Sequence, residues 1–228
     1  MRFAITEAYV RFALAVWGIF LTAIAASHWL GGTRSPNALL GWRSYRDGSA
    51  TISIHDVTTR QFVSVRGSLE TVFTWTPRSN ALDNQLVDTG QSARAVSADG
   101  RTAWVSNHEG NDEIYVMDMN GNAVNVSNHS AYDGAPAWSP DGRLAWVSFR
   151  DHNSEIYVLD LESGELINVS QNPRDDYAPT WSPDGLLAWE SFRDGNWEIY
   201  LLDITSGDLI NVSKQPGQDS DPVWLPAW

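Results

Sequence analysis

The sequence predicts an all-β fold made of repeated four-stranded antiparallel units, preceded by a single N-terminal transmembrane helix. Two observations carry this prediction. An uncharged segment covers residues 12–33, and a repeat of 42 to 43 residues fills much of the chain that follows. The 228 residues leave room for one ordinary domain beside such an anchor. We therefore expect an N-terminal transmembrane anchor or signal segment at 1–33 and one repeat domain at 34–228.

The uncharged segment at 12–33 contains no Asp, Glu, Lys or Arg over its 22 residues. At 1.5 Å of rise per residue, a helix of this length crosses a hydrocarbon layer of roughly 30 Å. Arg2 and Arg11 precede the segment, which favours a cytoplasmic N-terminus and an exported repeat domain. The alternative is a signal peptide cleaved near the small-x-small pattern Ala-Ile-Ala at 23–25, which would release a secreted protein. Both interpretations place the repeat domain in the periplasm or outside the cell.

The repeat is clearest at a turn motif, Trp-Ser-Pro-Asp-Gly, which begins at Trp138 and again at Trp181. Each unit continues through Glu-Ile-Tyr and an Asp, and it closes on Asn-Val-Ser. Short apolar stretches of strand length lie between these motifs, four per unit, separated by turns rich in Gly, Pro and Asp. Four-stranded antiparallel units at this period are typical of a β-propeller, in which each unit forms one blade.

The 12 tryptophans recur mainly at two positions of the repeat, and we expect them to fill the wedge between neighbouring blades. The unit that begins near Ser35 lacks an innermost strand, whereas the chain ends in such a strand around Trp224. We therefore expect the C-terminal strand to complete the blade built from residues 38–66 and to close the ring. Another unit, which starts at Trp75, spans about half a period. The prediction is four regular blades plus one reduced blade, in a ring of four or five.

These motifs resemble the repeats of the TolB-type β-propeller family, whose units contain Trp-Ser-Pro-Asp-Gly, Ile-Tyr, an Asp and a closing Val-Ser. The likeness covers residues 35–228. It implies a periplasmic or surface propeller that binds other proteins, and similar repeats also precede the hydrolase domain of prolyl-oligopeptidase-like enzymes. Members of the family usually have more blades than this chain, so the resemblance does not transfer their partner surfaces to it.

Charge and loop composition indicate a candidate binding surface. The net charge of −13 argues against nucleic-acid binding, and the absence of cysteine excludes disulfides and thiolate metal sites. In a propeller, the loops between second and third strands meet the loops to the next blade at one rim. Their charged side chains are the candidate partner-binding residues: Arg46, Asp47, Asp133, Arg150, Asp151, Asp175, Asp176, Arg193, Asp194, Asp219 and Asp221. Alternatively, each Arg pairs with an Asp of an adjoining loop and fixes the register of the blades.

The sequence lacks the motifs of common catalytic sites. It has no Gly-x-Ser-x-Gly elbow, and its histidines are scattered among loops. A calcium site at Asp194, Asn196 and Glu198 would lack the spacing of a calcium-binding loop. We therefore expect no enzymatic activity, no cofactor and no metal.

The predicted function is a non-catalytic, membrane-anchored extracytoplasmic propeller that acts as a protein–protein interaction or scaffold subunit. Residues 12–33 would contact the membrane, and the partner would be another membrane or envelope protein. The alternatives are a ligand- or glycan-binding sensor at the cell surface and a degenerate relative of the hydrolases.

Overall fold

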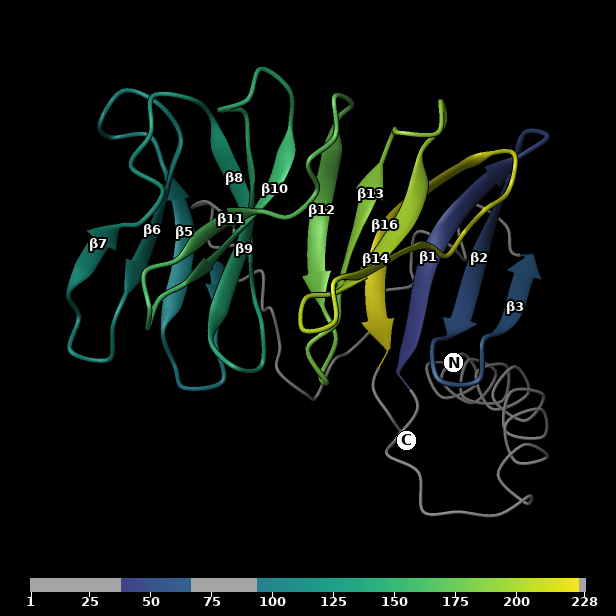
Figure 1. Cartoon of the computed structure of the whole chain (residues 1–228), viewed down its shortest axis with the longest axis horizontal. Helices are drawn as coiled ribbons and strands as arrows, with labels where there is room; N and C mark the ends of the chain where they lie inside the picture. The colour runs from purple at the N-terminus through teal and green to yellow at the C-terminus, as the bar shows by residue number, and fades with distance from the viewer. Residues whose placement is uncertain (1–37, 67–93, 226–228) are drawn as a thin grey trace, which may run out of the picture. The chain divides into compact units, whose positions relative to one another are not determined.

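The computed structural model describes residues 38–66 and 94–225, all within the compact unit Asn37–Trp228. Four antiparallel sheets of four strands each make up this part of the chain (Figure 1). The prediction of an all-β fold built from four-stranded units is therefore confirmed. No helix within the two described ranges is long and apolar enough to cross a membrane. The expected anchor at 12–33 and Trp75, where the reduced unit was expected to start, lie outside the described residues.

Three of the sheets follow the repeat, and in each of them the spatial order of the strands is their order in the chain. Sheet B contains β4 (Arg94–Val96), β5 (Thr102–Ser106), β6 (Glu113–Met117) and β7 (Ala123–Asn125). Sheet C contains β8 (Asp133–Trp138), β9 (Arg143–Ser148), β10 (Glu155–Asp160) and β11 (Leu166–Asn168). Sheet D contains β12 (Asp176–Trp181), β13 (Leu187–Ser191), β14 (Glu198–Asp203) and β15 (Asp208–Asn211).

Sheet A joins the first and last described strands. Its order is β16 (Gln218–Leu225), β1 (Leu39–Arg46), β2 (Ser49–Asp56) and β3 (Gln61–Arg66). Figure 1 shows the C-terminal strand β16 beside β1, and the register pairs Leu40 with Trp224. This confirms that the C-terminal strand completes the blade of residues 38–66, at the innermost position that β8 and β12 occupy in sheets C and D.

The Ser-Pro-Asp-Gly motif forms the turn between the first and second strands of sheets C and D. Gly142 and Gly185 adopt φ angles of +89° and +91°, a region that other residues rarely enter. Ser139 Oγ accepts a hydrogen bond from the backbone amide of Arg143 at 2.8 Å, and Ser182 forms the equivalent bond at 2.7 Å. The motif therefore closes the hairpin through both its backbone and its serine side chain.

Tryptophans fill the interfaces between successive sheets, as the repeat predicted. Trp42, Trp146 and Trp189 in the second strands are fully buried. The tryptophans of the innermost strands donate their indole N–H to a backbone carbonyl of the preceding sheet: Trp138 to Ala95 at 3.1 Å, Trp181 to Ala137 at 3.2 Å and Trp224 to Thr180 at 3.3 Å. These bonds join sheet B to C, C to D and D to A, and an apolar cluster fills each interface.

Each of these innermost strands contains a bulge before its tryptophan. Ala135, Ala178 and Asp221 adopt φ angles of +52°, +53° and +54°, and the pairing register shifts at each position. A bulge bends the strand and changes the direction of the side chains on either side of it. The side chains at the start of each innermost strand therefore point in a different direction from those after the bulge.

Replacing Trp224 by alanine would remove a buried ring from the interface of sheets D and A and leave the Thr180 carbonyl without its donor. We expect the free energy of unfolding, measured by urea denaturation of the full chain, to fall by about 3–5 kcal/mol. The control is Leu209→Ala on β15, where the side chain is 40% exposed; its effect should stay below about 0.5 kcal/mol. Equal losses in the two variants would contradict the interface role of Trp224.

Candidate functional site

The predicted site residues lie at one end of sheets A, C and D. The backbone register places the start of each innermost strand opposite the end of the second strand: Asp133 opposite Ser148, Asp176 opposite Ser191 and Asp219 opposite Ser44. The loops that follow these serines and the segments that lead into these aspartates form what is here termed the rim. All of the predicted partner-binding residues except Asp221, which lies inside β16, belong to it or to the strand ends beside it.

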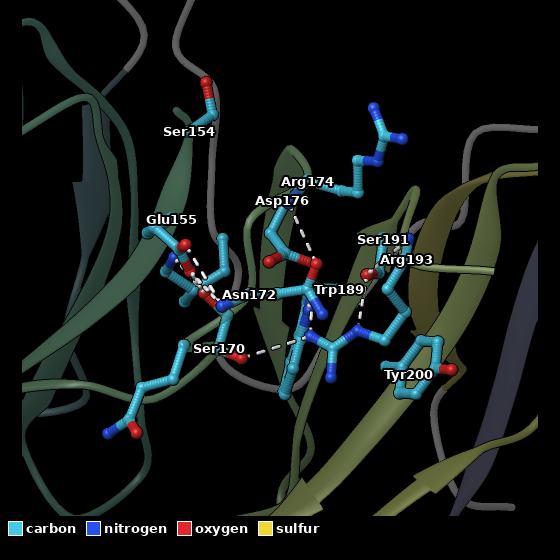
Figure 2. A network of polar contacts seen from close by, with 12 residues as sticks. Ser154, Glu155, Ser170, Asn172, Arg174, Asp176, Trp189, Ser191, Arg193 and Tyr200 are labelled. Atoms are coloured by element: carbon cyan, nitrogen blue, oxygen red, sulfur yellow. Dashed lines mark hydrogen bonds and ion pairs between the residues drawn. The ribbon is translucent and has the colours of Figure 1, made fainter. Parts of the chain in front are cut away.

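A buried aspartate organises the rim of sheet D (Figure 2). Asp176 has no exposed surface, and its Oδ1 accepts hydrogen bonds from the indole of Trp189 at 3.0 Å and from Arg193 at 3.4 Å. Arg193 donates through Nε to Ser191 Oγ at 2.7 Å and lies over the ring of Tyr200, 4.3 Å from its centroid. Burial raises the pKa of Asp176, while the bonds from Ser191 and Trp189 and the charge of Arg193 favour the carboxylate.

Sheets C and A repeat this arrangement with the same residue types. The members are Asp133 with Trp146 at 2.9 Å and Arg150 at 3.3 Å, and Asp219 with Trp42 at 3.2 Å and Arg46 at 3.7 Å. Six of the predicted rim residues are therefore bound to one another within the chain. This agrees with the alternative of internal Arg and Asp pairs, except that each partner is the buried Asp of the same sheet and not an Asp of an adjoining loop.

Arg193 also reaches the neighbouring sheet, where it meets a second buried network (Figure 2). Its Nη2 donates to the backbone carbonyl of Ser170 at 3.3 Å. Ser170 Oγ donates to the buried carboxylate of Glu155, which also accepts bonds from the backbone of Asn172 and the side chain of Asn153. Sheets B and D contain the same sets, Asn111 with Glu113 and Ser127, and Asn196 with Glu198 and Ser213. The Glu-Ile-Tyr and Asn-Val-Ser motifs thus hold the connections between sheets.

Two of the loop aspartates beside the arginines are held by hydrogen bonds within their own sheets. Asp151 accepts hydrogen bonds from the Tyr157 hydroxyl at 2.5 Å and from Asn168 at 2.9 Å. Sheet D repeats this set, at the same distances, with Asp194, Tyr200 and Asn211. Burial and the bond to the carboxylate raise the pKa of each tyrosine to about 12, so the hydroxyls remain donors at neutral pH.

The structure does not bring the considered calcium ligands together as a coordinating set. Asp194 accepts bonds from a tyrosine and an asparagine, whereas Asn196 donates to Glu198 at 2.6 Å. Across residues 38–66 and 94–225, no group of three or more His, Cys, Asp or Glu side chains could hold a metal ion.

The remaining predicted residues have separate environments. Asp47 is exposed in a turn with φ +51°. Asp175 accepts a hydrogen bond from the backbone amide of Ser154 at 3.0 Å. Asp221 pairs with Arg43 at 3.1 Å, on the side of sheet A that faces sheet D.

Aromatic side chains at the rim are a feature that the sequence reasoning missed. Tyr45, Tyr132, Phe149 and Tyr177 are between 36 and 51% exposed. Tyr177 packs against Trp197 with ring centroids 5.7 Å apart. The signal was present, because an aromatic residue precedes the rim Arg in the loops of sheets A, C and D. The accessible rim therefore combines aromatic rings with the exposed carboxylates of Asp47, Asp151 and Asp194.

Sheet B departs from this pattern. Its loop carries Asn107, His108 and Glu109 where the sister loops have an aromatic residue, Arg and Asp. The His108 ring lies 2.9 Å from Ser106 Oγ and 3.2 Å from the Tyr115 hydroxyl, so it remains within its own sheet. Within the described part of the chain, the Asp, Trp and Arg network is therefore a feature of sheets A, C and D.

Four-stranded antiparallel sheets, joined face to face by repeated tryptophans, resemble the blades of a β-propeller. The chain belongs to the TolB beta propeller domain family, because the PD40 model of that family matches residues 99–227, more than half of the sequence. The resemblance inferred from the repeat is confirmed at this level. No curated protein matches the chain.

Several solved structures are similar to this chain, one of them with a TM-score above 0.5. TolB from Acinetobacter baumannii has a TM-score of 0.51 and 18% identity, over 83% of this chain and 44% of that one. A putative TolB from Agrobacterium tumefaciens has a TM-score of 0.48 and 20% identity, over 79 and 64%. The propeller domain of the trilobed protease from Pyrococcus furiosus has a TM-score of 0.46 and 12% identity, over 80 and 68%. This chain thus spans less than half of the first structure and less than two thirds of the second.

Replacing Asp176 by alanine would leave the guanidinium of Arg193 and the indole of Trp189 without their shared acceptor. Because breaking a buried ion pair strands the remaining charge, we expect the free energy of unfolding to fall by about 3–5 kcal/mol. Urea denaturation of the full chain measures this loss. Asp208→Ala, at an exposed position of β15, is the control and should leave stability nearly unchanged. A similarly small effect of Asp176→Ala would contradict the organising role of this carboxylate.

Proposed function

We propose that this chain is a non-catalytic, membrane-anchored extracytoplasmic propeller that acts as an interaction or scaffold subunit of an envelope or membrane complex. The observation that supports the proposal is the composition of the accessible rim. Exposed aromatic rings lie beside carboxylates, while the arginines of the same loops turn toward buried aspartates. Aromatic side chains are enriched at protein interfaces, where they supply much of the binding energy.

The charge of the rim indicates the chemistry of the partner. The side chains of Arg150 and Arg193 are 13 and 12% exposed, whereas Asp47, Asp151 and Asp194 are exposed. The surface that a partner meets is thus more acidic than the loop sequences alone indicate. An Arg or Lys side chain docked here would find carboxylates and aromatic faces together. We therefore expect the rim to bind an extended segment of a membrane or envelope protein that carries Arg or Lys.

Burial of three of the rim carboxylates supports a non-catalytic role. Asp133, Asp176 and Asp219 have no exposed surface, and each already accepts hydrogen bonds from a tryptophan. A general acid or base must come within hydrogen-bond reach of its substrate. These three carboxylates serve the fold instead, and the proposal assigns them no catalytic part.

The proposed membrane attachment rests on residues 12–33 and is tested by the mass of the mature protein. Tagged full-length protein would be extracted from native membranes in a gentle detergent and measured intact. A chain that begins at Met1 and stays in the membrane fraction would support the anchor. A soluble chain shortened by about 25 residues would instead indicate signal cleavage and a released propeller.

The rim proposal is tested with two paired variants in sheet C. Tyr132→Ser with Phe149→Ser removes two exposed rim rings, whereas Leu166→Ser with Ile167→Ser removes two exposed apolar side chains from the outer strand β11. The binding partner is the protein that co-purifies with the tagged full-length chain in stoichiometric amount. We expect the first pair to weaken its binding by about 10-fold or more, and the second pair to leave its binding unchanged. Binding is measured on purified components.

Ionic strength provides an independent measurement on the same complex. An acidic rim bound to a basic segment should lose affinity as salt concentration rises, because the charges are partly exposed and therefore screened. Salt-insensitive binding, or equal losses in the rim pair and the outer-strand pair, would count against this docking surface.

A further inference from the structure

The interface between sheets D and A differs from its two sister interfaces at two positions, the first of which lies in the second strand of the sheet. This position lies opposite the Ile of the Glu-Ile-Tyr motif. It holds Val105 in β5 and Val147 in β9, and each valine packs in the apolar cluster between its sheet and the next. In β13 the same register position holds Glu190. Glu190 shares its face with Ala188, which packs against sheet A. An acid therefore stands where the repeat otherwise places valine.

The acid contacts the strand that completes sheet A. Glu190 Oε1 accepts a hydrogen bond from the backbone amide of Asp221 in β16. The Asp221 carboxylate in turn lies 3.1 Å from Arg43 Nε in β1. Asp221 occupies the left-handed bulge position that holds Ala135 in sheet C and Ala178 in sheet D. The interface thus replaces two small apolar positions of its sisters with charged side chains.

Among the described residues, the charged groups that act on Glu190 both come from sheet A. The carboxylate of Asp221 opposes ionisation of Glu190, and the guanidinium of Arg43 favours it. Within sheet D, the register neighbours are Ile199 and Tyr177, and the Tyr177 hydroxyl is directed to Ser154 of sheet C at 2.8 Å. Burial is the largest influence and raises the pKa of Glu190 to about 7. Glu190 therefore changes charge near neutral pH.

We propose that Glu190, Asp221 and Arg43 form a pH-sensitive latch between sheet D and the C-terminal strand β16. With Glu190 protonated, a neutral side chain fills the half-buried position and still accepts a hydrogen bond from the Asp221 amide through its unprotonated oxygen. With Glu190 ionised, two carboxylates share the guanidinium of Arg43 at a half-buried interface, and the contact loosens. The latch concerns closure of sheet A and is independent of the proposed rim function.

The direction of the effect follows from the difference between folded and unfolded chains. The pKa of Glu190 is about 7 in the folded chain, whereas the ordinary glutamate value of 4.5 applies to the unfolded chain. Its stabilising contribution is therefore complete below pH 4.5 and is lost as pH rises through 7. From pH 5.5 to 8.0, ionisation of this one group should raise the unfolding constant by roughly 25-fold.

Urea unfolding of the full chain in detergent, at pH 5.5 and at pH 8.0, tests the latch. Glu190→Gln is neutral at both values, and Glu190→Val restores the residue of the sister interfaces. We expect the ratio of the unfolding constants at the two pH values to be roughly 25-fold smaller in both variants than in the wild type. Glu162→Gln, at an exposed turn, is the control and should keep the wild-type ratio. A wild-type ratio in Glu190→Gln would overturn the proposal.

Variants of the two partners and a local measurement place the effect at β16. Asp221→Ala should shift the loss of stability to lower pH, and Arg43→Gln should shift it to higher pH, because the two charges act on Glu190 in opposite directions. Hydrogen exchange, corrected for its intrinsic pH dependence, should show greater protection of β16 at pH 5.5 than at 8.0, and this difference should vanish in Glu190→Gln. Equal protection of β16 in the wild type at both pH values would also overturn the latch.

Discussion

The hydrogen bond from an indole N–H to a carbonyl of the preceding sheet is the interaction on which the rest of this structure depends. It recurs at Trp138, Trp181 and Trp224, and the same rings close the apolar interfaces. A flat ring with one donor fixes both the separation and the relative height of two sheets. Because the heights agree, loops of neighbouring sheets meet, and Arg193 can reach the carbonyl of Ser170.

The buried aspartates show how charge is used within this framework. Each directs Oδ1 to its donors, whereas Oδ2 of Asp133, Asp176 and Asp219 is buried without a hydrogen-bond partner in the described residues. Burial of a carboxylate costs free energy, and leaving it buried without its partner costs more. Such a network therefore favours one arrangement of the chain over others. The rim arginines and the buried aspartates thus belong to the architecture, whereas the aspartates that follow the arginines in these loops stay exposed.

Periodicity explains why much of the fold was predictable. A repeat fixes the number of strands per unit, the turns and the recurring tryptophans, and a missing innermost strand at one end matched a surplus strand around Trp224 at the other. The partners of the rim arginines were not predictable from spacing. The direction of the preceding aspartate side chain depends on a bulge at Ala135 or Ala178, and no local sequence motif predicts this bulge. Glu190 was visible as a departure from valine, but its partners come from strands distant in sequence.

Sheet A also sets a condition on how the chain is made. Trp42 in its second strand and Asp219 in its innermost strand are bonded although 177 residues separate them. At about 5–20 residues per second, β1 leaves the ribosome roughly 10–35 s before β16 exists. Throughout that interval the inner edge of β1 presents unpaired backbone groups, which are a template for pairing with another nascent copy. Strand β1 therefore remains open to such pairing until β16 has been synthesised.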